Sequence, residues 1–216
     1  MKPALLLLTA LFLPSAALAE EGWTCVDYHT TPDKLTELEE AANIGSLSDA
    51  QKECLEKSYA ASAEQTTKNK ISRVLLVNAY AYDTEYWAGL VQRHLDEVDQ
   101  SDPNVAYLWA FYLYNRPENA DYEMVIHWID IALERKQIWE SDVYVKRVNQ
   151  LMKVRTLAAA KLWQAAASIP DISPEDLEKT RNRTKTFARE WIDFARSAEL
   201  DSTQAQILCI LSLIHI

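Results

Sequence analysis

Residues 102–134 read DPNVAYLWAFYLYNRPENADYEMVIHWIDIALE, and this stretch contains the clearest evidence for the fold. Its apolar side chains recur three or four positions apart in two blocks, which is the spacing of amphipathic helices. A polar loop around residues 115–117 separates the two blocks, and the Asp-Pro-Asn of residues 102–104 separates them from the chain before. The stretch therefore predicts two consecutive helices joined by a short turn.

The segment before this stretch has the same organisation. One apolar helical face is followed, after a short turn, by a second apolar face. The two faces comprise Leu75, Ala79 and Tyr82, and then Leu90, Val91, Leu95 and Val98. Two helix–turn–helix units of about 34 residues each thus follow one another from Ser72 onward.

These units resemble the tetratricopeptide repeat family. In the second unit, Trp109 stands at the family's large aromatic position in the first helix, and Asp121-Tyr122 stands at the turn before the second helix. Val125 and Ala132 stand at the two small packing positions of that second helix. The first unit has Leu75, Ala79, Val91 and Val98 at matching positions.

The repeats are degenerate, because Leu113, Arg116 and Gln137 depart from the family's small, aromatic and closing proline positions. The resemblance implies an all-α fold in which antiparallel helix pairs form a right-handed stack, an α-solenoid, over residues 67–210. It also implies that the first helix of each pair lines a concave groove.

The rest of the sequence is typical of helices as well. Only three glycines occur in 216 residues, whereas the turns of strand-rich folds rely on glycine for positive φ angles. Two further long helices are predicted, one that begins at Ser141 or Asp142 and ends before Pro170, and one that begins at Ser173-Pro174.

Residues 20–66 are predicted to form a helical hairpin that caps the repeats. Its first helix begins near Pro32 and ends near Asn43, and a capping-box pattern of Ser48 and Gln51 opens the second. This hairpin has few large apolar residues, so its hydrophobic core is predicted to be thin.

Two of the three cysteines, Cys25 and Cys54, lie in this hairpin. In an oxidising compartment we expect them to form a disulfide, which would contribute roughly 3–4 kcal/mol through the entropy of the unfolded chain. The alternative is two buried thiols. Cys209 is then the third cysteine, outside this predicted pair.

Residues 1–19 have the pattern of a secretory signal peptide. Lys2 precedes an apolar run, Pro14 ends that run, and Ala17-Leu18-Ala19 forms an A-x-A cleavage site. We expect cleavage after Ala19 and a periplasmic or secreted bacterial protein with no membrane insertion afterwards. The alternative is an uncut membrane anchor.

The last six residues, 211–216, read LSLIHI. This string resembles the translated end of a transposon used in sequencing libraries, so we expect it to be an artefactual tail on a truncated fragment. The alternative is a genuine apolar helix end.

Composition and motifs argue against several classes of activity. The formal net charge of −10 at pH 7 disfavours nucleic acid, whose phosphates require clustered Lys and Arg. A nucleophile elbow or a phosphate loop needs more glycines than the chain has. No metal-ligand spacing occurs among His29, His94, His127 and His215. We therefore predict no catalytic residues, no metal and no cofactor.

The chain contains ten tyrosines, and this excess suggests a binding surface. If the repeat register holds, the groove is lined by Arg73, Tyr80, Tyr107, Tyr114 and Tyr144. Tyrosine suits such a surface because it offers contact area and one hydroxyl at little cost in entropy. The alternative is that these rings are partly buried beneath neighbouring loops.

The sequence therefore predicts a non-catalytic scaffold or adaptor of the bacterial envelope that binds a protein or peptide. The acidic composition favours a partner that carries Lys or Arg. Two alternatives remain: the targeting arm of an enzyme whose catalytic domain lies beyond residue 210, or a structural subunit of an envelope complex.

Overall fold

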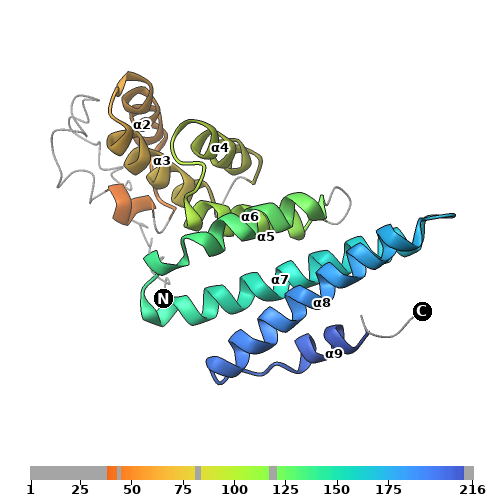
Figure 1. The fold of residues 1–216 in the computed structure, drawn as a ribbon. Helices are drawn as coiled ribbons and strands as arrows, with labels where there is room; N and C mark the ends of the chain where they lie inside the picture. The colour runs from red at the N-terminus through yellow and green to blue at the C-terminus, as the bar shows by residue number, and fades with distance from the viewer. Residues whose placement is uncertain (1–37, 43–44, 81–83, 117–120, 212–216) are drawn as a thin grey trace, which may run out of the picture.

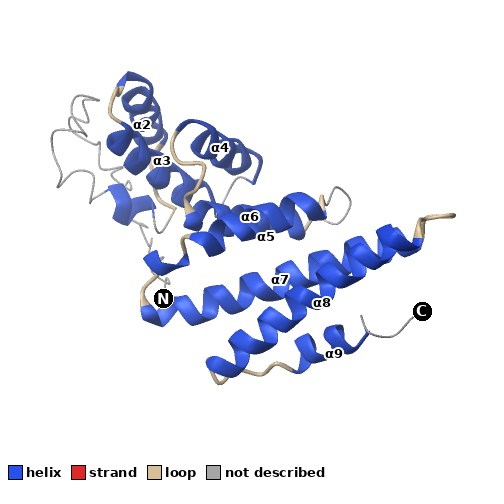
Figure 2. Ribbon diagram, in the orientation of Figure 1, coloured by secondary structure: helices blue, strands red, loops and turns tan. Residues whose placement is uncertain are grey.

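The computed structural model describes residues 38–42, 45–80, 84–116 and 121–211. Within these ranges the chain forms helices and no strand (Figures 1 and 2). The all-α fold class is therefore confirmed. The predicted signal peptide, Cys25 and all of the tail beyond Leu211 lie outside the described residues.

Residues 38–42 are helical and precede α2. The helices that follow, in chain order, are α2 (Asp49–Ala61), α3 (Gln65–Tyr80), α4 (Thr84–Glu97), α5 (Pro103–Tyr114), α6 (Tyr122–Glu134), the 3-10 helix η2 (Lys136–Ile138), α7 (Ser141–Ala167), α8 (Pro174–Ser197) and α9 (Thr203–Leu211). The two long helices predicted from the sequence are α7 and α8.

Side chains at the helix starts explain where several helices begin. The predicted capping box is confirmed: the Ser48 side chain accepts a hydrogen bond from the Gln51 N–H, and the Gln51 side chain accepts one from the Ser48 N–H. Asp102 caps α5, with Pro103 at the first helical position. The Asp-Pro-Asn sequence that breaks the chain thus also starts the next helix.

Each helix packs chiefly against the helices next to it in the sequence. The long helices α7 and α8 run side by side, α5 and α6 lie against α7, and α9 closes the far end (Figure 1). Contacts between helices further apart are fewer, and they include those of α5 with α7 and of α7 with α9, and ion pairs such as Arg93–Glu56 between α4 and α2. This pattern of neighbour contacts is typical of repeat proteins.

The buried side chains form two hydrophobic clusters. The first joins Leu38, Ala42 and Leu47 with α2, α3 and α4 and ends at Val105 on α5. The second begins at Ala106 on the same helix and runs through α9. Trp128 packs against both clusters. Helix α5 therefore lies at the boundary between two packed halves, and α4 has few contacts with it.

Among the described helices, none combines the length and the apolar character that a bilayer crossing requires.

Candidate functional site

One face of α3 leaves apolar side chains in solvent. Val77 is 44% exposed and Tyr80 is 62% exposed, and both follow Arg73 at the i+4 and i+7 positions of one helical stripe. The opposite face is the buried one, with Leu75 at 1% and Ala79 at 3%. The packing inside the first cluster thus determines which face of α3 remains free.

A cavity of about 320 Å³ opens beside this stripe. Its walls come from α3, α4, the first turns of α5, and Arg147 on α7. The lining residues are Arg73, Leu76, Val77, Tyr80, Trp87, Val91, Asn104, Val105, Leu108 and Arg147. Most of these side chains are apolar, and the polar ones are two arginines, one asparagine and one tyrosine. The buried apolar residues of its lining belong to the first hydrophobic cluster, and Arg147 reaches the cavity from α7.

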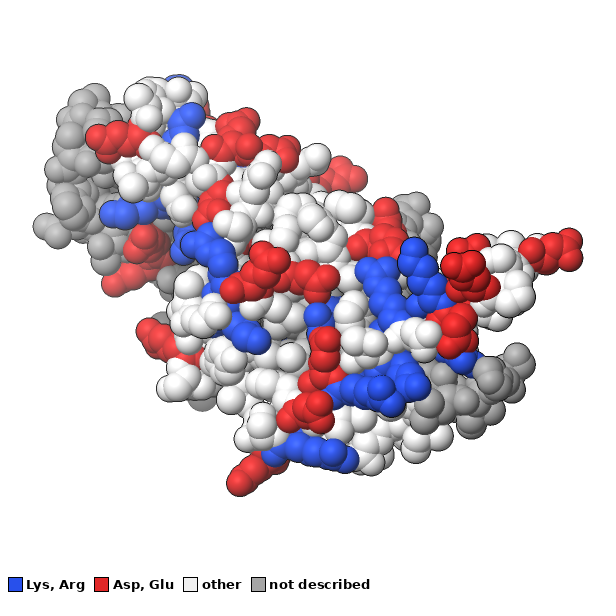
Figure 3. Space-filling model, in the orientation of Figure 1, with Lys and Arg blue, Asp and Glu red and all other residues white. Residues whose placement is uncertain are grey.

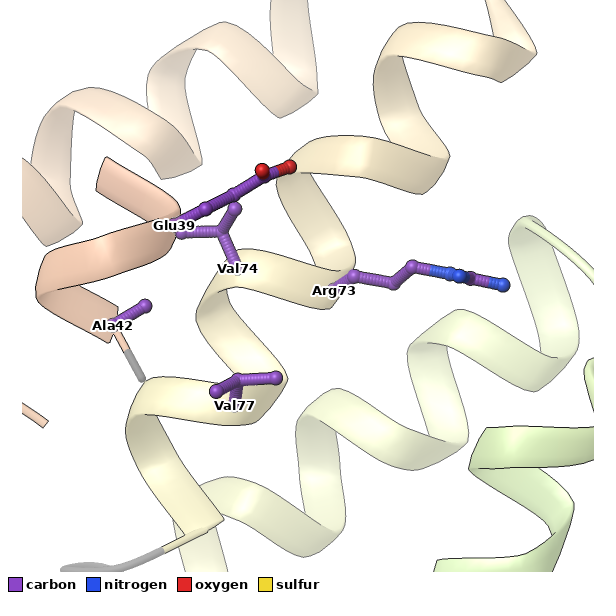
Figure 4. Close-up of a pocket in the computed structure, with 5 residues that line it drawn as sticks. All are labelled: Glu39, Ala42, Arg73, Val74 and Val77. Atoms are coloured by element: carbon purple, nitrogen blue, oxygen red, sulfur yellow. The ribbon is translucent and has the colours of Figure 1, made fainter. Parts of the chain in front are cut away.

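A second cavity of about 190 Å³ adjoins the first along α3. It is lined by Glu39, Ala42, Arg73, Val74 and Val77, so Arg73 and Val77 belong to both cavities. Figure 4 shows the Arg73 side chain pointing away from the helical segment that carries Glu39. We call the two adjoining cavities the α3 cleft.

Arg147 is held in position at the larger cavity. Its Nη1 donates a 2.5 Å hydrogen bond to Oδ1 of Asn104, which also accepts a 3.0 Å bond from Nε1 of Trp139. The guanidinium lies 5.5 Å from the ring centre of Tyr107 and 5.4 Å from that of Trp139. These distances are within the range of cation–π attraction.

Arg73, the other arginine of the cleft, pairs with Asp102 at 2.5 Å. The Asp102 carboxylate is fully buried and caps α5 through the N–H groups of Asn104 and Val105. Burial by itself raises the pKa of Asp102. The polar contact with His94, the charge of Arg73 and the two N–H groups outweigh it and lower the pKa to about 2.

Asp102 also belongs to a buried Ser–His–Asp arrangement. The His94 Nδ1 lies 3.0 Å from Ser72 Oγ, and its Nε2 lies 3.3 Å from Asp102 Oδ2. All three side chains are 0% exposed. A nucleophilic serine must meet a substrate, and Ser72 lies in the core of α3, so we assign the arrangement to joining α3, α4 and α5. The three residues span 30 positions of the chain. No sequence motif connects them, so the sequence did not predict this arrangement.

The structure separates the five residues predicted to line a groove. Arg73 and Tyr80 line the larger cavity. Tyr107 is partly buried beneath Arg147, and its hydroxyl donates a 2.6 Å hydrogen bond to Gln150. Tyr114 packs edge-on against Tyr122, and Tyr144 packs edge-on against Phe194. Arg73 and Tyr80 thus lie together, Tyr107 is next to them, and the other two lie elsewhere.

Burial raises the pKa of two of these five residues, Tyr107 and Tyr114. The charge of Arg147 opposes this effect at Tyr107.

The sequence analysis did not identify Val77, Trp87, Leu108 or Arg147 as parts of a site. The spacing of Val77 and Tyr80 after Arg73 is a signal that could have identified Val77. Nothing in the sequence indicates that Arg147, 74 positions after Arg73, lines the same cavity.

The surface charge is mixed on the face drawn in Figure 3, where basic and acidic side chains alternate over α7 and α8. Arg183 of α8, for example, pairs with Glu123 of α6. In the described part of the chain, no cluster of three or more His, Cys, Asp or Glu side chains is arranged to hold a metal ion.

Compared with known proteins, the chain matches no family model, no curated protein sequence and no solved structure.

Proposed function

We propose that this chain is a non-catalytic adaptor that binds a segment of another protein in the α3 cleft. The observation that carries the proposal is the exposed apolar stripe of Val77 and Tyr80 beside a cavity with apolar walls. Apolar surface of this kind, next to a few polar groups, is what a binding site for a side chain of a partner requires.

The location of the cleft supports the proposal. The buried walls of the larger cavity, among them Leu76, Trp87 and Val105, belong to the first hydrophobic cluster, and Arg147 reaches the cavity from α7. A pocket lined mainly by apolar side chains with a few polar groups is typical of ligand-binding sites. We further propose that the helix pairs form a right-handed α-solenoid, since neighbouring helices provide most of the contacts.

We place this adaptor in the bacterial envelope, in the periplasm or outside the cell, because residues 1–19 have the pattern of a signal peptide. The same compartment allows the proposed disulfide between Cys25 and Cys54.

The first test concerns the exposed stripe of α3. We expect Val77→Asp and Tyr80→Ala each to weaken binding by at least about 10-fold, since each removes apolar contact area at the centre of the site. The probes are dodecapeptides selected from a phage-displayed library against the purified protein. Their dissociation constants are then measured by fluorescence anisotropy.

Ile169→Asp is the matched control, because Ile169 is 56% exposed in the turn between α7 and α8. It should leave peptide binding unchanged. Circular dichroism should show the same helical content for all variants, since the substituted side chains are largely exposed. If no selected peptide responds to Val77→Asp or Tyr80→Ala, the α3 cleft is not the binding site.

A second test concerns the proposed disulfide. A non-reducing tryptic digest of the exported protein should contain one peptide pair linked through Cys25 and Cys54. We expect Cys54→Ala to lower the free energy of unfolding by about 3 kcal/mol, because the unfolded chain regains the entropy of a long loop. Two unlinked peptides that react with a thiol reagent after denaturation would contradict the pairing.

A further inference from the structure

Arg147 differs from the arginines that pair with carboxylates elsewhere in the structure. Arg93 pairs with Glu56 at 2.7 Å, and Arg183 pairs with Glu123 at 2.6 Å. In the ranges that the structure describes, Arg147 contacts a neutral amide and two aromatic rings, and no carboxylate pairs with it. The charge of this guanidinium is therefore not neutralised locally.

The position of Arg147 is largely fixed before any ligand arrives. Asn104, which accepts its hydrogen bond, is itself held by the indole N–H of Trp139. The rings of Tyr107 and Trp139, whose centres are 6.2 Å apart, both lie beside the guanidinium and reduce its access to water. A positioned and partly desolvated arginine loses little entropy when it binds a carboxylate, and its planar fork matches both carboxylate oxygens.

The apolar part of the cavity is within reach of the same ligand. Leu76, Trp87, Val91, Val105 and Leu108 line the cavity to which Arg147 also contributes. Its volume of about 320 Å³ is at the lower end of the range of pockets that take small ligands, which suits a single large side chain. Arg73 adds little net charge, because the buried carboxylate of Asp102 neutralises it.

We propose that the cleft recognises a peptide in which one aspartate or glutamate lies next to a large apolar residue. The apolar side chain fills the cavity of about 320 Å³, and the carboxylate pairs with Arg147. This inference rests on the proposed function and specifies the ligand of the same site. It differs from the partner rich in Lys and Arg that the net charge favours, because a contact is governed by local charge and the net charge acts over longer distances.

Two features limit the acidic character of this ligand. Glu39 lines the smaller cavity and repels a further carboxylate at that end of the cleft. The chain as a whole has a net charge of −10, which slows the approach of a strongly acidic partner. The ligand is therefore a peptide with one carboxylate at Arg147 and not a run of acidic residues.

The experiment compares selected dodecapeptides with versions in which the one Asp or Glu becomes Asn or Gln. We expect selection to enrich Asp or Glu beside a large apolar residue, and the amide version to bind the wild-type protein about 10-fold more weakly. Arg147→Gln should remove this difference between the two peptides. Arg147→Lys should retain part of it, since the charge stays and the planar fork is lost.

Arg183→Gln is the matched control, because Arg183 also lies over an aromatic ring, that of Phe187 at 5.6 Å, and is far along the chain on α8. It should leave the preference for the acidic peptide intact. Thermal melts of all variants verify that they fold.

The outcomes separate this inference from the proposed function. Peptides that lose affinity with Val77→Asp but bind equally well as acid and amide would overturn the role of Arg147 and leave the cleft as the binding site. Enrichment of Lys or Arg beside the apolar residue would overturn it too. Peptides that no cleft variant affects would overturn both proposals.

Discussion

Replacing Asp102 with Ala is expected to lower the free energy of unfolding by about 2–4 kcal/mol, through the loss of a helix cap and of a buried polar contact. The substitution removes the cap of α5 and the buried carboxylate that lies 3.3 Å from Nε2 of His94. The lost ion pair with Arg73 contributes little to this figure, because the Arg73 side chain is 47% exposed and solvent screens the pair. Urea unfolding followed by circular dichroism measures the loss.

Asp121→Ala is the matched control for this prediction. Asp121 caps α6 in the same way, through the N–H groups of Glu123 and Met124, but it is exposed. Its replacement should cost only about 1 kcal/mol, the usual contribution of a helix cap. Equal losses for the two variants would mean that the buried contacts of Asp102 add nothing to its capping role.

Acid titration separates the contribution of the Asp102 charge to stability from the contribution of its helix cap. Its pKa is about 2 in the folded protein, below its ordinary value of 3.8. The folded state therefore favours the carboxylate, and the resulting stability is complete above about pH 4 and is lost as the pH falls towards 2. We expect the wild type to lose about 2 kcal/mol more than Asp102→Asn over this interval. Asn retains a cap oxygen without the charge.

The second large effect on stability is expected at Trp87, which is 2% exposed and lines the larger cavity. Its ring centre lies 5.5 Å from that of Tyr80 and 5.2 Å from that of Tyr112. Trp87→Ala should lower the free energy of unfolding by about 3–5 kcal/mol, because it removes the contacts of a large enclosed side chain and leaves a void. Urea unfolding with circular dichroism detection is again the measurement.

Trp87→Phe is the variant whose stability is compared with that of Trp87→Ala. The indole N–H of Trp87 is buried and has no hydrogen-bond partner in the described part of the protein. Phenylalanine removes that unpaired donor and keeps an aromatic ring, so the loss should be only about 1–2 kcal/mol. A loss below about 1 kcal/mol for Trp87→Ala would show that the ring is not enclosed as the structure places it.

The stability of the fold and the proposed site are connected through α5. Asp102 fixes the start of this helix and binds Arg73 at the cleft, while Asn104 in its first turn holds Arg147. A substitution that loosens the first turn of α5 therefore alters both arginines of the cleft. For this reason the binding tests use Val77 and Tyr80, exposed on α3, and the partly exposed Arg147 on α7, whereas the stability tests use buried side chains.

The sequence by itself determined the helical class and most helix starts. Local signals were sufficient for these features: Ser48 with Gln51 opens α2, and Ser173 with Pro174 opens α8. The resemblance to the tetratricopeptide repeat family placed Arg73 and Tyr80 together, and both line the larger cavity because residues seven positions apart lie on one face of a helix.

Only the tertiary structure decided which residues from different helices meet. Arg147 joins the cavity of Arg73, and His94 joins Ser72 and Asp102 in the core, through contacts between residues far apart in the chain. It also decided that Tyr114 and Tyr144 pack against other rings, away from the cavity that Arg73 and Tyr80 line. The physical reason is that helical periodicity determines which face of a helix is apolar, whereas the packing of neighbouring helices determines how much of that face is covered.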